Sequence, residues 1–204
     1  MKLDKSSLVD PEFGVLLAQF RDKLKRVVRC RMDRRLQGRI DASDVVQDAC
    51  MEAARRYPEF RKEAKMPVYL WLRFLTMQQL AILQRQHLGS KMRSVMREVS
   101  LQGEQFPTAN VAMLADVLSG NFTSPSSAVA RKELQSRLIA ALDALDPHDR
   151  EILTLRHFEQ LNTVESAQVL GISEGLASTR YGRAVRKLLV VIKELFGSES
   201  EFRP

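Results

Sequence analysis

Residues 146–195 read DPHDREILTLRHFEQLNTVESAQVLGISEGLASTRYGRAVRKLLVVIKEL and contain three helix patterns joined by two short connections. The first pattern begins at Asp146-Pro147, an N-cap residue followed by proline at the first helical position. Asn162 is placed to cap a short second helix, and Glu165 completes a capping-box pattern with it. The turn Gly171-Ile172-Ser173 leads into a final helix, which its serine caps. This order of helix, glycine-containing turn and capped helix predicts a helix-turn-helix.

The final helix of this stretch has two faces of different character. An apolar stripe is formed by residues spaced four, three and four apart: Ala177, Tyr181, Ala184 and Leu188. The opposite face carries small polar or basic residues, which suit a helix that approaches base edges in the major groove. The predicted DNA contacts on this face are Ser178, Thr179, Gly182, Arg183 and Arg186. Taken alone, the pattern also fits two packed helices with an ordinary solvated basic surface.

Helical spacing of apolar residues also predicts three helices in the first half of the chain. The first runs from about Glu12 to Gln37, and Gly38 is placed to end it. Arginine and lysine surround its apolar stripe, which is compatible either with a solvated surface or with a nucleic-acid contact. Asp41 or Ser43 is placed to cap the second helix.

The second helix is expected to end before Pro58, because a residue that precedes proline disfavours helical backbone. A polar stretch from Glu59 to Met66 is then expected to connect it to a third helix, which begins at Pro67. Trp71 lies among large apolar residues in this third helix and is interpreted as a core anchor.

The fold class predicted from these patterns is all-α, with two helical domains joined by a flexible linker. We place the first domain at residues 1–98, the linker at 99–128, the second domain at 129–197 and a tail at 198–204. The linker range contains Gly103, Pro107, Gly120 and the sequence TSPSS, all typical of turns and breaks in helices.

Composition places the chain among globular proteins that carry excess positive charge. Its 204 residues are 45% hydrophobic and 28% charged, with a formal net charge of +7. Positive charge attracts phosphate backbones or anionic membrane surfaces whatever their sequence. No apolar run approaches the roughly 20 residues of a membrane span, and the opening residues lack the apolar stretch of a signal peptide. We therefore expect a cytoplasmic protein with no membrane partner.

Residues that could support catalysis or metal binding are sparse. The histidines are His87, His148 and His157, and none has a spacing to Cys, Ser or a carboxylate that suggests a catalytic site. Cys30 and Cys50 lack metal-ligand and CxxC spacing, which predicts free thiols in a reducing compartment. A glycine-rich phosphate loop is missing from the sequence. We expect no enzyme activity, cofactor, metal or small-molecule substrate.

Two blocks of the sequence resemble a known family. Residues 142–192, LDALDPHDREILTLRHFEQLNTVESAQVLGISEGLASTRYGRAVRKLLVVI, resemble domain four of the extracytoplasmic-function (ECF) sigma factors. Residues 41–60, DASDVVQDACMEAARRYPEF, together with 68–86, VYLWLRFLTMQQLAILQRQ, are similar to domain two of the same family. The TSPSS sequence before a charged helix is most similar to the branch common in planctomycetes.

The resemblance implies a transcription-initiation subunit that binds core RNA polymerase and promoter DNA and that an anti-sigma factor can control. Domain two would bind the polymerase clamp through Asp44, Gln47 and Asp48. The stretch 59–66 and the following helix would recognise the melted minus-ten element, with Gln78, Gln79 and Arg85 as candidate contacts. Domain four would read the minus-thirty-five element with the five residues named above.

The chain departs from the family pattern after its Trp-Leu pair. The family usually carries Asn, then Asp and several Arg there, whereas this chain has Gln78, Ile82 and Arg85. A free-standing helix-turn-helix regulator, with residues 1–100 as a sensing or dimerising module, is the main alternative. It would bind duplex DNA without polymerase, usually as a dimer on paired half-sites. An enzyme and a purely structural adaptor are less well supported.

Overall fold

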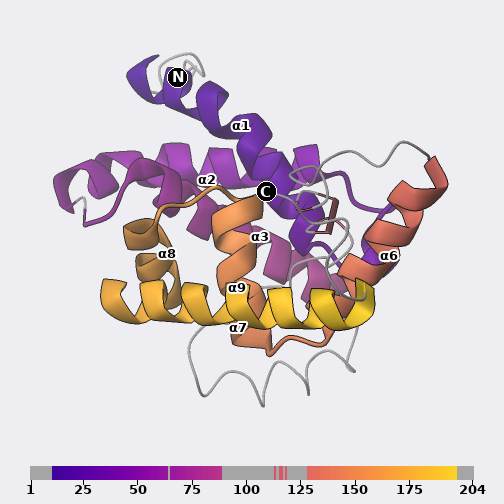
Figure 1. Ribbon diagram of the computed structural model, residues 1–204. Helices are drawn as coiled ribbons and strands as arrows, with labels where there is room; N and C mark the ends of the chain where they lie inside the picture. Colours follow the sequence, from indigo (N-terminus) through magenta and orange to yellow (C-terminus); the bar gives the residue numbers. More distant parts are fainter. Residues whose placement is uncertain are drawn as a thin grey trace, which may run out of the picture. The chain divides into compact units, whose positions relative to one another are not determined.

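The computed structural model describes residues 11–63, 65–88, 113, 115, 116, 118 and 128–196. Its regular secondary structure within these ranges is helical, apart from one isolated bridge between Gln37 and Ile40 (Figure 1). The chain divides into two compact units, Met1–Thr108 and Ala109–Pro204. The all-α prediction is therefore confirmed. None of the described helices combines the length and apolar composition that crossing a membrane requires.

The first unit contains three long helices: α1 (Pro11–Arg31), α2 (Ala42–Glu63) and α3 (Val68–Leu88). Each of these helices contacts the other two. Their buried apolar residues include Leu24, Val27, Val28, Val45, Val46, Ala49, Leu72, Leu75 and Leu80. The spacing of these residues places one buried face on α1 and one on α2, whereas α3 is buried over more of its circumference.

The connection between α1 and α2 differs from the prediction of a helix that reaches Gln37. α1 ends at Arg31, and a single 3-10 turn (Arg34–Leu36) follows. The Asp33 carboxylate accepts hydrogen bonds from the backbone N–H of Arg35 at 2.8 Å and from its guanidinium. These local hydrogen bonds compete with helical backbone at Asp33, which explains why α1 does not continue to Gln37. Helix propensity alone does not predict this. Asp41 then accepts from the Ser43 N–H at 2.7 Å at the start of α2, as predicted.

The expectation that the second helix ends before Pro58 is wrong, and so is the expectation that 59–66 is entirely a connecting stretch. α2 passes through Pro58 and ends at Glu63. Aromatic packing explains the extension, because the Phe60 ring stacks on Trp71 of α3 with centroids 4.2 Å apart. On the preceding turn, Tyr57 stacks on Phe13 of α1 at 3.9 Å. These contacts offset the hydrogen bond that proline removes.

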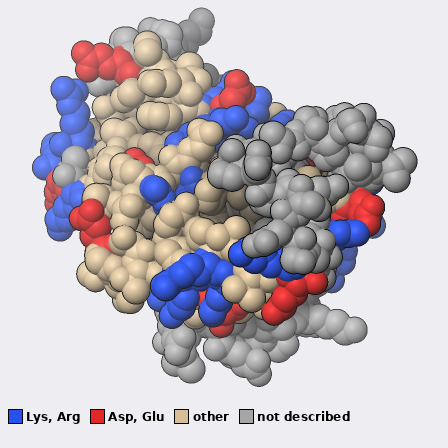
Figure 2. Space-filling view, viewed as in Figure 1, with Lys and Arg blue, Asp and Glu red and all other residues tan. Residues whose placement is uncertain are grey.

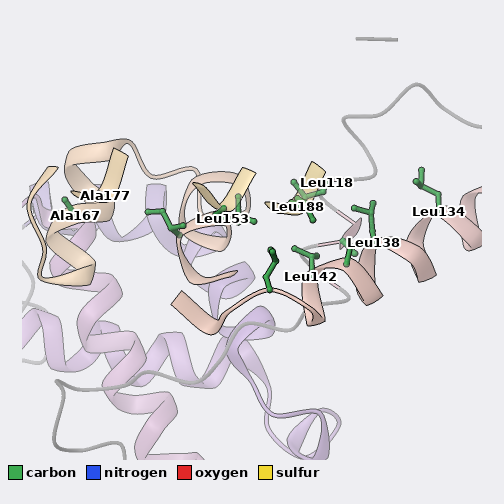
Figure 3. Packing of buried hydrophobic residues seen from close by; sticks show 13 residues of the cluster. Leu118, Leu134, Leu138, Leu142, Leu153, Ala167, Ala177 and Leu188 are labelled. Atoms are coloured by element: carbon green, nitrogen blue, oxygen red, sulfur yellow. The ribbon is translucent and has the colours of Figure 1, made fainter. Parts of the chain in front are cut away.

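The second unit consists of α6 (Ala128–Asp143), α7 (Pro147–Leu153), a π-helical turn (Thr154–Phe158), α8 (Thr163–Leu170) and α9 (Glu174–Phe196). α9 contacts α6, α7 and α8. One hydrophobic cluster joins these helices, and Figure 3 shows it extending from Ala167 and Ala177 at one end to Leu134 at the other. Ala115 and Leu118, which lie within the range expected as linker, are buried in the same cluster.

The C-terminal core gives a direct test of this packing. Leu138 is fully buried in the cluster, so Leu138→Ala should lower the free energy of unfolding by about 2–5 kcal/mol through lost burial and a residual cavity. Urea denaturation followed by circular dichroism measures the change. Leu189→Ala is the matched control, because Leu189 of α9 is 44% exposed. Equal losses in the two variants would contradict the assignment of Leu138 to the core.

Candidate nucleic-acid interface

Hydrogen bonds at the helix ends build the predicted helix-turn-helix. Asp146 accepts from the His148 N–H at 2.8 Å and caps α7. Asn162 and Glu165 form a complete capping box at the start of α8, with hydrogen bonds of 2.8 and 2.9 Å. Gly171 ends α8 in the left-handed region, with φ of +63°, where a side chain would be strained. The Ser173 hydroxyl then accepts from the Leu176 N–H at 3.3 Å at the start of α9.

The apolar stripe of α9 faces the core as the sequence predicted. Ala177 and Ala184 are completely buried, Leu188 is nearly so and Tyr181 is half-buried. This packing turns the opposite side of the helix outward. Lys and Arg side chains gather over the strip where Figure 1 places α9 (Figure 2). α9 is therefore a fixed helix with one packed face and one accessible basic face.

Four of the five predicted DNA contacts lie on one side of α9. Ser178, Thr179 and Arg186 are exposed, and Gly182 between them is half-buried. A Cβ atom added at Gly182 would meet no other atom within 4 Å, so the packing of this chain does not require glycine there. The absence of a side chain at this position leaves room for a close approach to the helix backbone.

Arg183, the fifth predicted contact, lies toward the flank of this face and is engaged within the chain. Its Nη2 atom lies 2.7 Å from Oδ1 of Asp149 on α7, and its Nε lies 3.2 Å from the same oxygen. Nζ of Lys187, one turn further along α9, lies 2.6 Å from Oδ2 of Asp149. One carboxylate on α7 therefore binds two cations of α9.

Asp149 is held in its ionised form by these contacts. Burial of its carboxylate raises the pKa, but the hydrogen bonds and charges of Lys187 and Arg183 outweigh burial and place the pKa below its ordinary value. The side chain is 0% exposed, whereas its two partners are each about half exposed. Asp149 also lies in the first turn of α7, where the helix dipole favours negative charge.

A second polar contact joins the π-helical turn to α9. The Tyr181 hydroxyl and Nε2 of His157 are 3.1 Å apart. Burial and the neighbouring Arg156 guanidinium lower the pKa of His157, which keeps the imidazole neutral near pH 7. Arg156 also lies over the Tyr181 ring and donates to the Leu161 carbonyl oxygen at 2.7 Å. Sequence analysis missed both this contact and the Asp149 pairs, because each joins residues more than twenty positions apart.

The predicted polymerase contacts share an exposed face of α2 in the first unit. Asp44, Gln47 and Asp48 are all exposed, at positions that a helix brings to one side. Met51, one turn further along, is 48% exposed on the same face. The surface therefore combines two carboxylates with an accessible apolar side chain.

The predicted minus-ten contacts are distributed over α3. Gln78 and Arg85 are seven residues apart on one side of the helix, with the 40% exposed Ile82 between them. Gln79 lies about 100° around the helix from Gln78. Both glutamines are half-buried, and the Arg85 Nε donates to the Ala81 carbonyl oxygen of its own helix at 3.2 Å. The parts of the chain that the structure describes contain no group of three or more potential metal ligands.

Comparisons with known proteins agree with this arrangement. Residues 135–188, which contain α7, α8 and α9 as far as Leu188, match the family described as "Sigma-70, region 4". The chain is 27% identical over 176 residues to the ECF RNA polymerase sigma factor BldN of Streptomyces coelicolor (strain ATCC BAA-471 / A3(2) / M145). These matches support the ECF sigma factor family. The alignment covers 86% of this chain but 58% of BldN, so the chain spans little more than half the length of that relative.

Two further similarities concern a short stretch of sequence and the overall fold. Over 51 residues the chain is 39% identical to the RNA polymerase sigma-E factor of Streptomyces antibioticus, covering 25% of this chain and 28% of that protein. The structure of CnrH in complex with the cytosolic domain of CnrY has a similar fold, with a TM-score of 0.50 and 23% identity. That similarity covers 89% of this chain and 88% of CnrH.

Because Asp149 is ionised in the folded protein, we expect its contribution to stability to disappear at low pH. Asp149→Asn should lower the free energy of unfolding by about 2 kcal/mol at pH 7, because it removes hydrogen bonds between charged groups. The folded-state pKa lies below the ordinary value of 3.8, so this contribution is complete above that value and is lost as the pH falls through the folded-state pKa. In urea titrations from pH 7 to pH 2.5, the difference in stability between wild type and variant should therefore become smaller at the acid end. A difference that grows on acidification would contradict the assignment.

Proposed function

We propose that this chain is a sigma factor that binds core RNA polymerase and directs promoter-specific transcription initiation. The observation that carries the proposal is α9, which has a buried stripe of Ala177, Ala184 and Leu188 and an accessible face of small and basic residues. This helix lies within the region that matches sigma-70 region 4. No chemical step is needed from the protein, because the activity consists of binding energy that positions polymerase and stabilises opened DNA.

In this proposal residues 129–197 read the minus-thirty-five element, and α9 enters the major groove. Ser178, Thr179 and Arg186 are accessible for base or phosphate contacts, and Gly182 lets the helix approach closely. Arg183 belongs to the same set, but its contact with Asp149 directs it to the edge of the interface. The resulting surface has polar groups of both hydrogen-bonding kinds, which direct readout of bases uses.

Residues 1–98 would serve as domain two, which binds polymerase and the minus-ten element. The acidic face of α2 suits a basic helix of the polymerase clamp, and exposed Met51 adds an apolar contact. The end of α2, the connection to α3 and the residues Gln78, Gln79 and Arg85 would contact opened DNA, whose bases are accessible only after strand separation. Residues 99–128 would connect the domains, although Ala115 and Leu118 within this range pack in the core of the second unit.

The proposal extends to the surroundings of the protein. It acts in the cytoplasm, where polymerase and promoter DNA are found, and an anti-sigma factor is the class of regulatory partner that the resemblance implies. The TSPSS sequence supports placement in the planctomycete-type branch. No enzyme activity, cofactor, metal or small-molecule substrate forms part of the proposal.

Binding to core polymerase is the decisive test. The wild-type chain, mixed with sigma-free RNA polymerase, should co-elute on size exclusion and support promoter-dependent transcription. Asp48→Arg should reduce co-elution strongly, because it reverses the charge of the proposed clamp contact. The fold should be retained, since Asp48 is exposed and is not part of the core. Asp22→Arg is the matched control, since Asp22 on α1 is 93% exposed and lies outside the α2 face. Tight binding to duplex DNA without polymerase, and no co-elution, would favour a free-standing regulator.

The accessible face of α9 makes a second test possible. Arg186→Ala should weaken recognition of the minus-thirty-five element by about 1–3 kcal/mol, the amount typical of a bidentate base contact. The measurement is transcription or open-complex formation by the reconstituted holoenzyme on promoters with single substitutions. Lys193→Ala in the last turn of α9 is the control. Unchanged promoter preference after Arg186→Ala would show that this residue does not contact the minus-thirty-five element.

A further inference from the structure

The flank of α9 carries three cations that differ in their surroundings. Arg180, Arg183 and Lys187 are spaced three and four residues apart, so they form one stripe beside the proposed reading face. Arg183 and Lys187 bind the buried Asp149 carboxylate at 2.7 and 2.6 Å. Arg180 forms no ion pair with any residue that the structure describes. The same stripe therefore contains two cations that share one carboxylate, and a third cation with no acidic partner among the described residues.

The geometry around Asp149 is that of an anion bound by two cations. Its two oxygens are shared between them, Oδ1 with the Arg183 guanidinium and Oδ2 with the Lys187 ammonium group. A DNA phosphate offers the same kind of anionic oxygens to arginine and lysine. The carboxylate itself is completely buried, whereas Arg183 and Lys187 remain 52% and 48% exposed. Both cations thus lie at the surface, yet each is bound on its inner side by the buried carboxylate of Asp149.

We propose that Asp149 acts as an internal substitute for a DNA phosphate and withholds Arg183 and Lys187 from sequence-independent backbone binding. The inference rests on the proposed DNA-binding function of α9. Binding to duplex of any sequence is driven by cations that replace counterions on phosphates. Asp149 offsets one of the two positive charges and holds both side chains by hydrogen bonds, so the pair contributes less to that attraction than two free cations would. Promoter choice therefore depends more on Ser178, Thr179 and Arg186. Asp149 is therefore a specificity-determining residue that makes no contact with DNA.

The salt dependence of non-specific binding tests this proposal without polymerase. The full chain is titrated onto a fluorescent DNA duplex of unrelated sequence at several salt concentrations, and the slope of log K against log salt is measured. Arg180→Gln should reduce the slope by about 0.9, the amount expected for one lost phosphate contact. Lys187→Gln, on the same stripe, should reduce the slope by clearly less than Arg180→Gln does, because Lys187 is held by Asp149. Equal reductions in the two variants would overturn the proposal.

Removal of the carboxylate should have the opposite effect. Asp149→Asn should steepen the slope by about 0.9, because it removes the one negative charge that Arg183 and Lys187 share, and should tighten binding to unrelated duplex at low salt. Asp143→Asn is the matched control, because it changes the net charge equally but removes an exposed carboxylate whose partner is the largely buried Arg150 of α7. If both variants steepen the slope equally, the change results from net charge alone, and the proposal is overturned.

Two safeguards keep the result interpretable. Circular dichroism establishes whether Asp149→Asn is folded at the assay temperature, and if it is not, the comparison of Lys187→Gln with Arg180→Gln still decides the question. Failure of the chain to bind polymerase would refute the sigma-factor function while leaving the salt slopes intact. Slopes that contradict the expected order, with polymerase binding retained, would refute only the role of Asp149.

Discussion

Close packing of the α9 stripe is the constraint on which the C-terminal unit depends. Ala177, Ala184 and Leu188 lie in one cluster with residues of α6, α7 and α8, so a single helix is in contact with the three others. Two of these three side chains are methyl groups, which lets the neighbouring helices approach closely. Once this stripe is buried, the angle of α9 is fixed and its polar face can only point outward. The orientation of the reading face is thus a consequence of core packing.

An electrostatic connection acts on top of this packing. Asp149 lies in the first turn of α7 and binds cations one turn apart on α9, so it couples the first helix of the motif to the flank of the last. Hydrogen bonds to a buried carboxylate are directional, in contrast to apolar contacts, and here they join α7 to one side of α9. Apolar packing supplies the affinity between the helices, and the charges select the register. The His157–Tyr181 contact joins the intervening π-helical turn to the same helix.

Local patterns predicted much of this fold, and long-range contacts explain the rest. The capping box of Asn162 and Glu165 and the left-handed Gly171 depend on neighbours within a few residues, so the sequence alone indicated them. The continuation of α2 through Pro58 depends on the stacking of Phe60 on Trp71 from another helix, which no local rule contains. The pairing of Asp149 with Arg183 spans 34 positions. The sequence shows the acidic residue in the first turn of α7 and the two cations one turn apart on α9, but it does not show that these side chains are in contact.

The distribution of aromatic residues gives the first unit its own optical label. Trp71 is the single tryptophan of the chain, and it lies against Phe60 and near Tyr57 in the first unit. Tyr181, one of three tyrosines, belongs to the second unit and points its hydroxyl toward His157. Indole emission excited at the red edge therefore originates entirely from the N-terminal unit. Any ligand, partner or denaturant that changes its wavelength or intensity identifies which half of the chain responds, without a dye and without a change in the sequence.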